Sequence, residues 1–171
     1  MKQAKSLFVV GLVLSCIAGV AHYAVAQERA TPQELMQKVR EAAAELSGKG
    51  EGGVSEFANR PSPWVWKDTY IVVLDCSKGV MAANPMKTEL VGKALTSLKD
   101  VKGNPAFELL CAASDSRNGV WVEYWVPKPG EKEGSRKVSY GYQSAGTPFV
   151  VCAGVFAEQP TLDDLTRLIA K

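Results

Sequence analysis

Apolar residues in the N-terminal third of the sequence recur every three or four positions, which is typical of a helix with one buried face. The segment begins at Thr31, which can cap a helix, with Pro32 fitting its first turn and Glu34 completing a capping box. The apolar positions of this segment are Leu35, Val39, Ala42, Ala43 and Leu46. We therefore expect an amphipathic helix, followed by a flexible glycine-rich segment over residues 48–53.

Further along the chain, apolar, β-branched and aromatic residues gather in short runs bounded by glycine, proline or asparagine, as in strands. The expected strands are residues 69–74, 80–83, 120–126, 136–143 and 149–156. Helical spacing returns at residues 107–113 and 162–170, whereas the segments 56–68 and 86–104 are expected to be irregular connections.

Short turns between consecutive strands favour an antiparallel sheet. The order is helix, two strands, a helical insertion, three strands and helix, which predicts an α+β fold. We expect a five-stranded antiparallel sheet with the N-terminal helix on one face. The insertion between Ala83 and Gly119 would cover the other face and leave a cavity beneath it.

The first residues of the sequence indicate where the protein resides. Lys2 and Lys5 precede an apolar run over residues 7–20, and Ala24-Val25-Ala26 has the small-residue pattern of a cleavage site. These features predict a signal peptide, residues 1–26, removed after Ala26 from a periplasmic or secreted protein. An uncleaved N-terminal anchor is the alternative. The rest, residues 27–171, fits one domain, with its core over about residues 32–157 and a short C-terminal helix over 161–170.

Charge and histidine content exclude several functions for the cleaved chain. Removing 26 of the 171 residues leaves 145, and Lys+Arg falls from 20 to 18, equal to the 18 Asp+Glu. A neutral chain has no electrostatic reason to bind nucleic acid or to insert stably in a membrane. The only histidine, His22, lies in the predicted signal peptide. The absence of imidazole argues against triad catalysis, a zinc site or haem, so we expect no enzyme, no metal and no cofactor.

Three cysteines remain after cleavage, and their spacing matches no CxxC or zinc motif. In an oxidising compartment we expect a disulfide between Cys76 and Cys111. Cys152 lies in an apolar run and is expected to be a buried thiol. An activated thiol at Cys76 is disfavoured because no histidine is present and the neighbouring Asp75 opposes thiolate formation.

Three stretches carry a resemblance to a known family. The first runs from Asp68 to Asp75 and continues through Lys78-Gly79 to Asn84-Pro85; the second is Gly119 to Gly130; the third is Lys137 to Tyr140. Together they resemble a single Cache domain, the extracytoplasmic ligand-sensing module of bacterial receptors, whose PAS-like sheet follows a long N-terminal helix. Asn84 stands where the family often has histidine. The chain ends about 15 residues after its last strand, so the resemblance implies a freestanding form.

The resemblance implies a small-molecule ligand, for which a small organic carboxylate is the favoured class. The candidate ligand-binding residues are Trp66, Tyr70, Asn84, Trp121, Tyr124, Lys137 and Tyr140. Lys137 is the best candidate cation, and Tyr70 and Tyr140 are the best hydroxyl donors. Alternation along the strands places Trp121 and Tyr124 on opposite faces of the sheet, and likewise Lys137 and Tyr140. The sequence does not tell which face lines the cavity.

The expected function is therefore sensing by binding, without catalysis, alongside a membrane-bound receptor or sensor kinase. Cache domains often associate through their long helix, so the resemblance is compatible with a homodimer. Two alternatives remain at this point. One is a thiol/disulfide redox protein that uses Cys76 and Cys111, and the other is a structural or adaptor domain with a filled pocket.

Overall fold

The computed structural model describes residues 28–112 and 115–170, so the predicted signal peptide lies outside the described residues. The helices are α1 (Pro32–Lys49), α2 (Ala106–Ala112) and α3 (Leu162–Ile169), with 3-10 helices η1 (Gly50–Phe57), η2 (Thr88–Leu90) and η3 (Leu95–Ser97). The strands are β1 (Val65–Trp66), β2 (Thr69–Tyr70), β3 (Val72–Asp75), β4 (Val80–Ala83), β5 (Val120–Pro127), β6 (Gly134–Gln143) and β7 (Phe149–Phe156). Within this part of the chain, none of the helices combines the length and apolar character needed to span a membrane.

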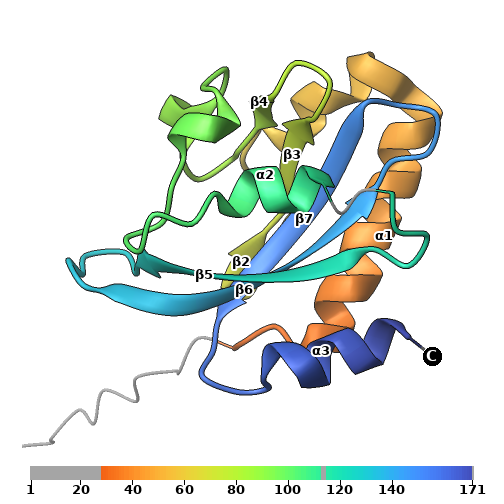
Figure 1. Cartoon of the computed structure of the whole chain (residues 1–171). Coiled ribbons are helices and arrows are strands. Elements are labelled where there is room, and N and C mark those ends of the chain that lie inside the picture. Colours follow the sequence, from red (N-terminus) through yellow and green to blue (C-terminus); the bar gives the residue numbers. More distant parts are fainter. Residues whose placement is uncertain (1–27, 113–114, 171) are drawn as a thin grey trace, which may run out of the picture.

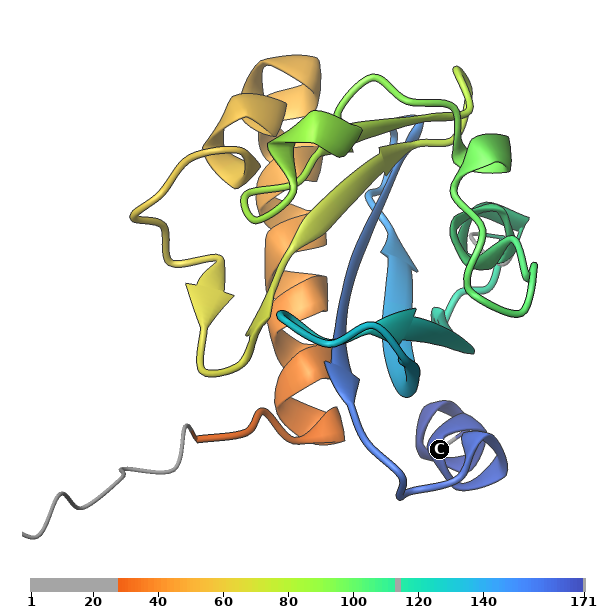
Figure 2. The same cartoon turned by 90° about the vertical axis from the view of Figure 1, so that its left-hand side faces the viewer.

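The last five strands form one antiparallel sheet in the order β4-β3-β7-β6-β5, and β1 and β2 form a separate two-stranded ladder (Figure 1). Helix α1 runs along one face of the sheet, and α2 with the rest of the insertion lies on the other face (Figure 2). The predicted α+β fold, with five antiparallel strands between two different covers, is confirmed.

The start and the buried face of α1 follow the sequence prediction. The Thr31 hydroxyl accepts a hydrogen bond from the Glu34 N–H at 3.2 Å, and the Glu34 carboxylate accepts one from the Thr31 N–H at 2.7 Å. The five apolar residues expected to face the core are the five that are buried. Helix α1 runs for 18 residues along β6 and β7, while η1 packs against β3 and β4 and α3 packs against β5.

The sheet separates two apolar cores. The core under α1 includes Val73, Val138, Tyr140, Val151 and Trp121 from the strands. The core under the insertion includes Leu74, Val122, Tyr124, Val150 and Cys152, which meet Leu95 and Leu110. Successive strand residues therefore alternate between the two cores, as the period of a strand requires.

Three connecting segments differ from the predictions. The segment expected to be flexible after α1 forms η1 instead, because Phe57 at its end is buried in the core under α1. The strand expected over residues 69–74 is interrupted at Ile71, whose N–H donates to the Trp64 carbonyl oxygen rather than to the main sheet. The insertion before α2, expected to be irregular, contains η2 and η3.

Candidate functional site

A cavity of about 290 Å³ lies between the sheet and the insertion. This volume is close to the lower end of the range for small-molecule sites. Its polar lining residues are Tyr70, Asn84, Lys87, Lys99, Asp100, Tyr124, Lys137 and Ser139. Its apolar lining includes Val72, Leu90, Leu98, Phe107, Val126 and Cys152. The cavity has the mixed character of a ligand site, with apolar walls and a few polar groups.

Lys137 is the central charged group of this cavity. It lies on β6, directly across from Tyr124 on β5 and from Phe156 on β7. Its Nζ atom is 5.4 Å from the centre of the Tyr70 ring and 5.2 Å from that of Phe156, within the range of cation–π contacts. None of the ion pairs among the described residues involves Lys137. Burial lowers the pKa of the Lys137 amine from 10.5 to about 8.

Two hydroxyl groups lie on the same sheet face as Lys137. The hydroxyls of Tyr124 and Ser139 are 2.9 Å apart and both residues are buried. Burial raises the pKa of Tyr124 and of Tyr70 above the usual range for tyrosine. Both phenols therefore stay protonated and can donate hydrogen bonds to an anion.

Among the residues that the structure describes, Asp100 is the only acidic one that lines the cavity, and its oxygens are already engaged. They accept hydrogen bonds from the N–H groups of Lys102, Asn104 and Trp125 and from the Asn104 amide. Burial opposes ionisation, but these hydrogen bonds outweigh it and hold the pKa of Asp100 at about 2. Asp100 thus fastens the insertion to β5 rather than pairing with Lys137.

Asn84 lines the cavity, but its side chain stabilises the turn that follows it in the chain. Its side-chain oxygen accepts hydrogen bonds from the N–H groups of Met86 and Lys87 at 3.1 and 2.8 Å. Its amide nitrogen contacts only the Met81 sulfur, at 3.5 Å. Lys87 and Lys99 are exposed lining residues, so they place positive charge where the cavity meets solvent.

The seven candidate residues divide between the two faces of the sheet. Tyr70, Asn84, Tyr124 and Lys137 line the cavity, whereas Trp66, Trp121 and Tyr140 belong to the core under α1. The rings of Trp121 and Tyr140 are 5.2 Å apart, and the Tyr140 hydroxyl donates to the Asn118 carbonyl oxygen at 2.6 Å. These three aromatic side chains therefore pack in the core under α1 and do not line the cavity.

Four polar residues that line the cavity are not among the candidates predicted from the sequence. Ser139 could have been found, because it shares a strand face with Lys137. Asp100 precedes Gly103-Asn104, a turn signal, but its bond to β5 is long-range and leaves no local trace. Lys87 and Lys99 look like ordinary solvated lysines in the sequence.

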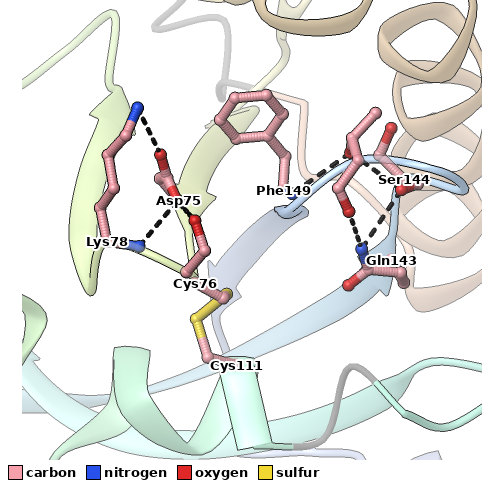
Figure 3. The surroundings of a disulfide bond; sticks show 9 residues. Asp75, Cys76, Lys78, Cys111, Gln143, Ser144 and Phe149 are labelled. Atoms are coloured by element: carbon pink, nitrogen blue, oxygen red, sulfur yellow. Dashed lines mark hydrogen bonds and ion pairs between the residues drawn. A yellow bond between two sulfur atoms is a disulfide. The ribbon is translucent and has the colours of Figure 1, made fainter.

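The predicted disulfide between Cys76 and Cys111 is confirmed, and Figure 3 shows it joining the end of β3 to α2. The Cα atoms are 5.6 Å apart. Cys152 is a free, buried thiol on the cavity wall, and burial raises the pKa of the Cys152 thiol to about 12. Among the residues that the structure describes, no cluster of His, Cys, Asp and Glu side chains is placed to hold a metal ion.

Comparison with known proteins gives a consistent result. A family model described as "Single Cache domain 2" matches residues 6–160. Curated protein sequences yield no significant match.

Three solved structures share the fold. One is a Cache chemosensory domain described in terms of carboxylic acid recognition, with 23% identity over 74% of this chain and 92% of that one and a TM-score of 0.59. Another is the periplasmic sensor domain of a chemotaxis protein (22% identity, 74% and 90% coverage, TM-score 0.53). The third is a methyl-accepting chemotaxis protein from Vibrio parahaemolyticus (24% identity, 78% and 89% coverage, TM-score 0.52).

Proposed function

From the premise that this chain belongs to the single Cache domain family, whose members are extracytoplasmic sensory domains, we propose that its cavity binds a small organic carboxylate. The observation that carries the proposal is the unpaired Lys137 ammonium inside the cavity. A buried cation without a counter-ion is unfavourable, and a carboxylate would supply both the charge and the hydrogen-bond acceptors. The hydroxyls of Tyr70 and Tyr124 would donate to the same group.

The charge balance of the lining favours an anion over a cation. Three lysines line the cavity, at positions 87, 99 and 137, and the one carboxylate, Asp100, is already satisfied by hydrogen bonds. A ligand ammonium group would find no free carboxylate there. The structural neighbour described for carboxylic acid recognition has the same fold and adds support by analogy.

We further propose that the protein acts in the periplasm by binding alone and passes its signal to a membrane-bound receptor or sensor kinase. The two alternatives have less support. A redox enzyme would need an activated thiolate, but the Asp75 carboxylate beside Cys76 opposes thiolate formation, and Cys152 is buried with a raised pKa. An adaptor with a filled pocket fits poorly with a cavity of about 290 Å³.

The experiment is a thermal-shift titration of the purified protein with propionate, benzoate and the matched amine propylamine. A ligand at 100 times its Kd stabilises by about 2.7 kcal/mol, which corresponds to roughly 5–10 °C for a domain of this size. We expect a saturable shift with a carboxylate and none with the amine.

Lys137→Met should abolish the carboxylate shift, whereas Lys132→Met should keep it. Lys132 is exposed on the hairpin between β5 and β6 and does not line the cavity, so it is the matched control. A carboxylate shift that survives in Lys137→Met would contradict the proposed site. An equal shift with propylamine would contradict the proposed ligand class.

A further inference from the structure

The cavity has a cover whose two ends are fastened to the sheet by different means. Helix α2 contributes Ala106 and Phe107 to the lining, and the Phe107 ring lies 6.2 Å from that of Tyr124. The helix has seven residues, and a helix of this length is not stable by itself in water. Its position over the cavity therefore depends on its attachments.

The attachment before α2 is polar and the attachment at its C-terminal end is covalent. Asp100 accepts a hydrogen bond from the Trp125 N–H at 2.9 Å, and the Val101 N–H donates to the Trp125 carbonyl oxygen at 3.0 Å. At the other end, Cys111 in the last turn of α2 is bonded to Cys76 at the end of β3 (Figure 3). Between them the buried Leu110 side chain packs in the core under the insertion.

The disulfide differs from the third cysteine in accessibility. Cys76 and Cys111 are both partly exposed, whereas Cys152 is only 3% exposed. This partial exposure makes the Cys76–Cys111 pair, and not Cys152, the candidate for attack by a dithiol reductant in the folded protein. Breaking that bond would remove the covalent link between the C-terminal end of α2 and β3, and leave the packing of Leu110 in the core.

We propose that the oxidation state of the Cys76–Cys111 pair regulates the cavity, with reduction by an extracytoplasmic dithiol loosening α2 and weakening ligand binding. A thiolate of the reductant attacks one sulfur, the protein S–S bond breaks and a mixed disulfide forms. The second thiol of the reductant then displaces the protein sulfur. Two electrons pass to the protein, which gains two thiols, and the reductant leaves as a disulfide.

The part of this inference that concerns ligand affinity rests on the proposed function. By linkage, a ligand that needs α2 in place must oppose reduction by the same factor by which reduction lowers its affinity. Bound ligand should therefore protect the disulfide from the reductant.

The test compares the oxidised protein, the same protein reduced with dithiothreitol, and the double variant Cys76→Ser, Cys111→Ser. The variant Lys132→Met, which does not line the cavity, is the control that keeps the disulfide. Hydrogen exchange of the amides in α2 and in β6 reports local opening, and calorimetry reports propionate affinity. We expect reduction to speed exchange in α2 at least tenfold, to leave β6 unchanged, and to lower propionate affinity five- to twentyfold.

Unchanged exchange in α2, or propionate affinity equal within twofold in the two oxidation states, would overturn the inference while leaving the proposed function intact. Faster exchange in β6 as well as α2 would also overturn it, because the loss would then be global. The reduced wild-type protein gives the answer even where the double variant does not fold. If propionate binds neither form, the proposed function is contradicted. Hydrogen exchange in α2 then decides by itself whether the disulfide holds this helix in place.

Discussion

Replacing Lys137 with methionine should stabilise the unliganded protein while removing its capacity to bind an anion. The substitution exchanges an ammonium group for an apolar chain of similar length that can adapt to the cavity. In the wild type, this ammonium is close to two aromatic rings and has no carboxylate partner among the described residues. Removing the ammonium therefore loses little electrostatic attraction, and it removes the free-energy cost of burying a charge.

The size of the effect follows from the pKa of the Lys137 amine. A lowering from 10.5 to about 8 by burial corresponds to at most about 3 kcal/mol against the charged form. The side chain is partly exposed, so solvent screening reduces this value. We expect Lys137→Met to raise the free energy of unfolding by about 1–2 kcal/mol near pH 7, or roughly 2–6 °C in Tm.

The pH dependence has a definite sign. Below pH 8 the folded and unfolded states both carry the proton, so the wild type bears the full penalty of the buried charge. Between about pH 8 and 10.5 the unfolded state binds more protons than the folded state, and wild-type stability gains with pH from this group. The advantage of Lys137→Met should therefore be largest near neutral pH and vanish at about pH 10.5.

Thermal denaturation of the wild type, Lys137→Met and Lys132→Met across this pH range measures the effect. The control at the exposed Lys132 should stay within about 0.5 kcal/mol of the wild type at every pH. A Lys137→Met protein that is less stable than the wild type at pH 7 would refute the reasoning. So would an advantage that does not change between pH 7 and pH 10.

Four further variants are tested by urea denaturation, three around the cavity and one on α1. Asp100→Asn should cost about 1–3 kcal/mol at pH 7 because an NH₂ group replaces one acceptor oxygen and removes two of its four hydrogen bonds. Wild-type stability from this group should be lost as pH falls from about 4 towards 2. Loss of the disulfide in Cys76→Ser, Cys111→Ser should cost about 2–4 kcal/mol. Gly154→Ala should cost about 1–3 kcal/mol because its methyl group would overlap β6. By contrast, Gly48→Ala, in open space on α1, should stabilise by about 0.5–1 kcal/mol.

The elements that the sequence predicts well are those whose signals are local. The capping box at Thr31 and the spacing of apolar residues define α1, and the run from Phe149 to Phe156 matches β7 end to end. The η1 helix was missed because glycines dominate the segment. Tertiary contacts hold it in place, among them the burial of Phe57 in the core under α1 and the ion pair between Lys78 and Glu51.

The sequence predicts which residues share a face of the sheet, but it does not predict which of the two faces holds the candidate site. Alternation separates Tyr124 from Trp121 and Lys137 from Tyr140 without telling which face holds a cavity. That choice depends on how the insertion folds back over the sheet, which is a long-range property. The Asp100 bonds that fasten the insertion to β5 are of the same kind, because they join positions 25 residues apart.

The two covers of the sheet explain why the cavity lies on the face of Lys137. Helix α1 is continuous over β6 and β7, and together with η1 and α3 its side chains fill the core on that face. The opposite cover consists of the short helices η2, η3 and α2, which leave a gap between them. Beneath that gap, Gly154 lines the cavity, and the Ser139 hydroxyl occupies the space that a side chain on Gly154 would need. A discontinuous cover over small residues leaves a space, and Lys137 gives that space its charge.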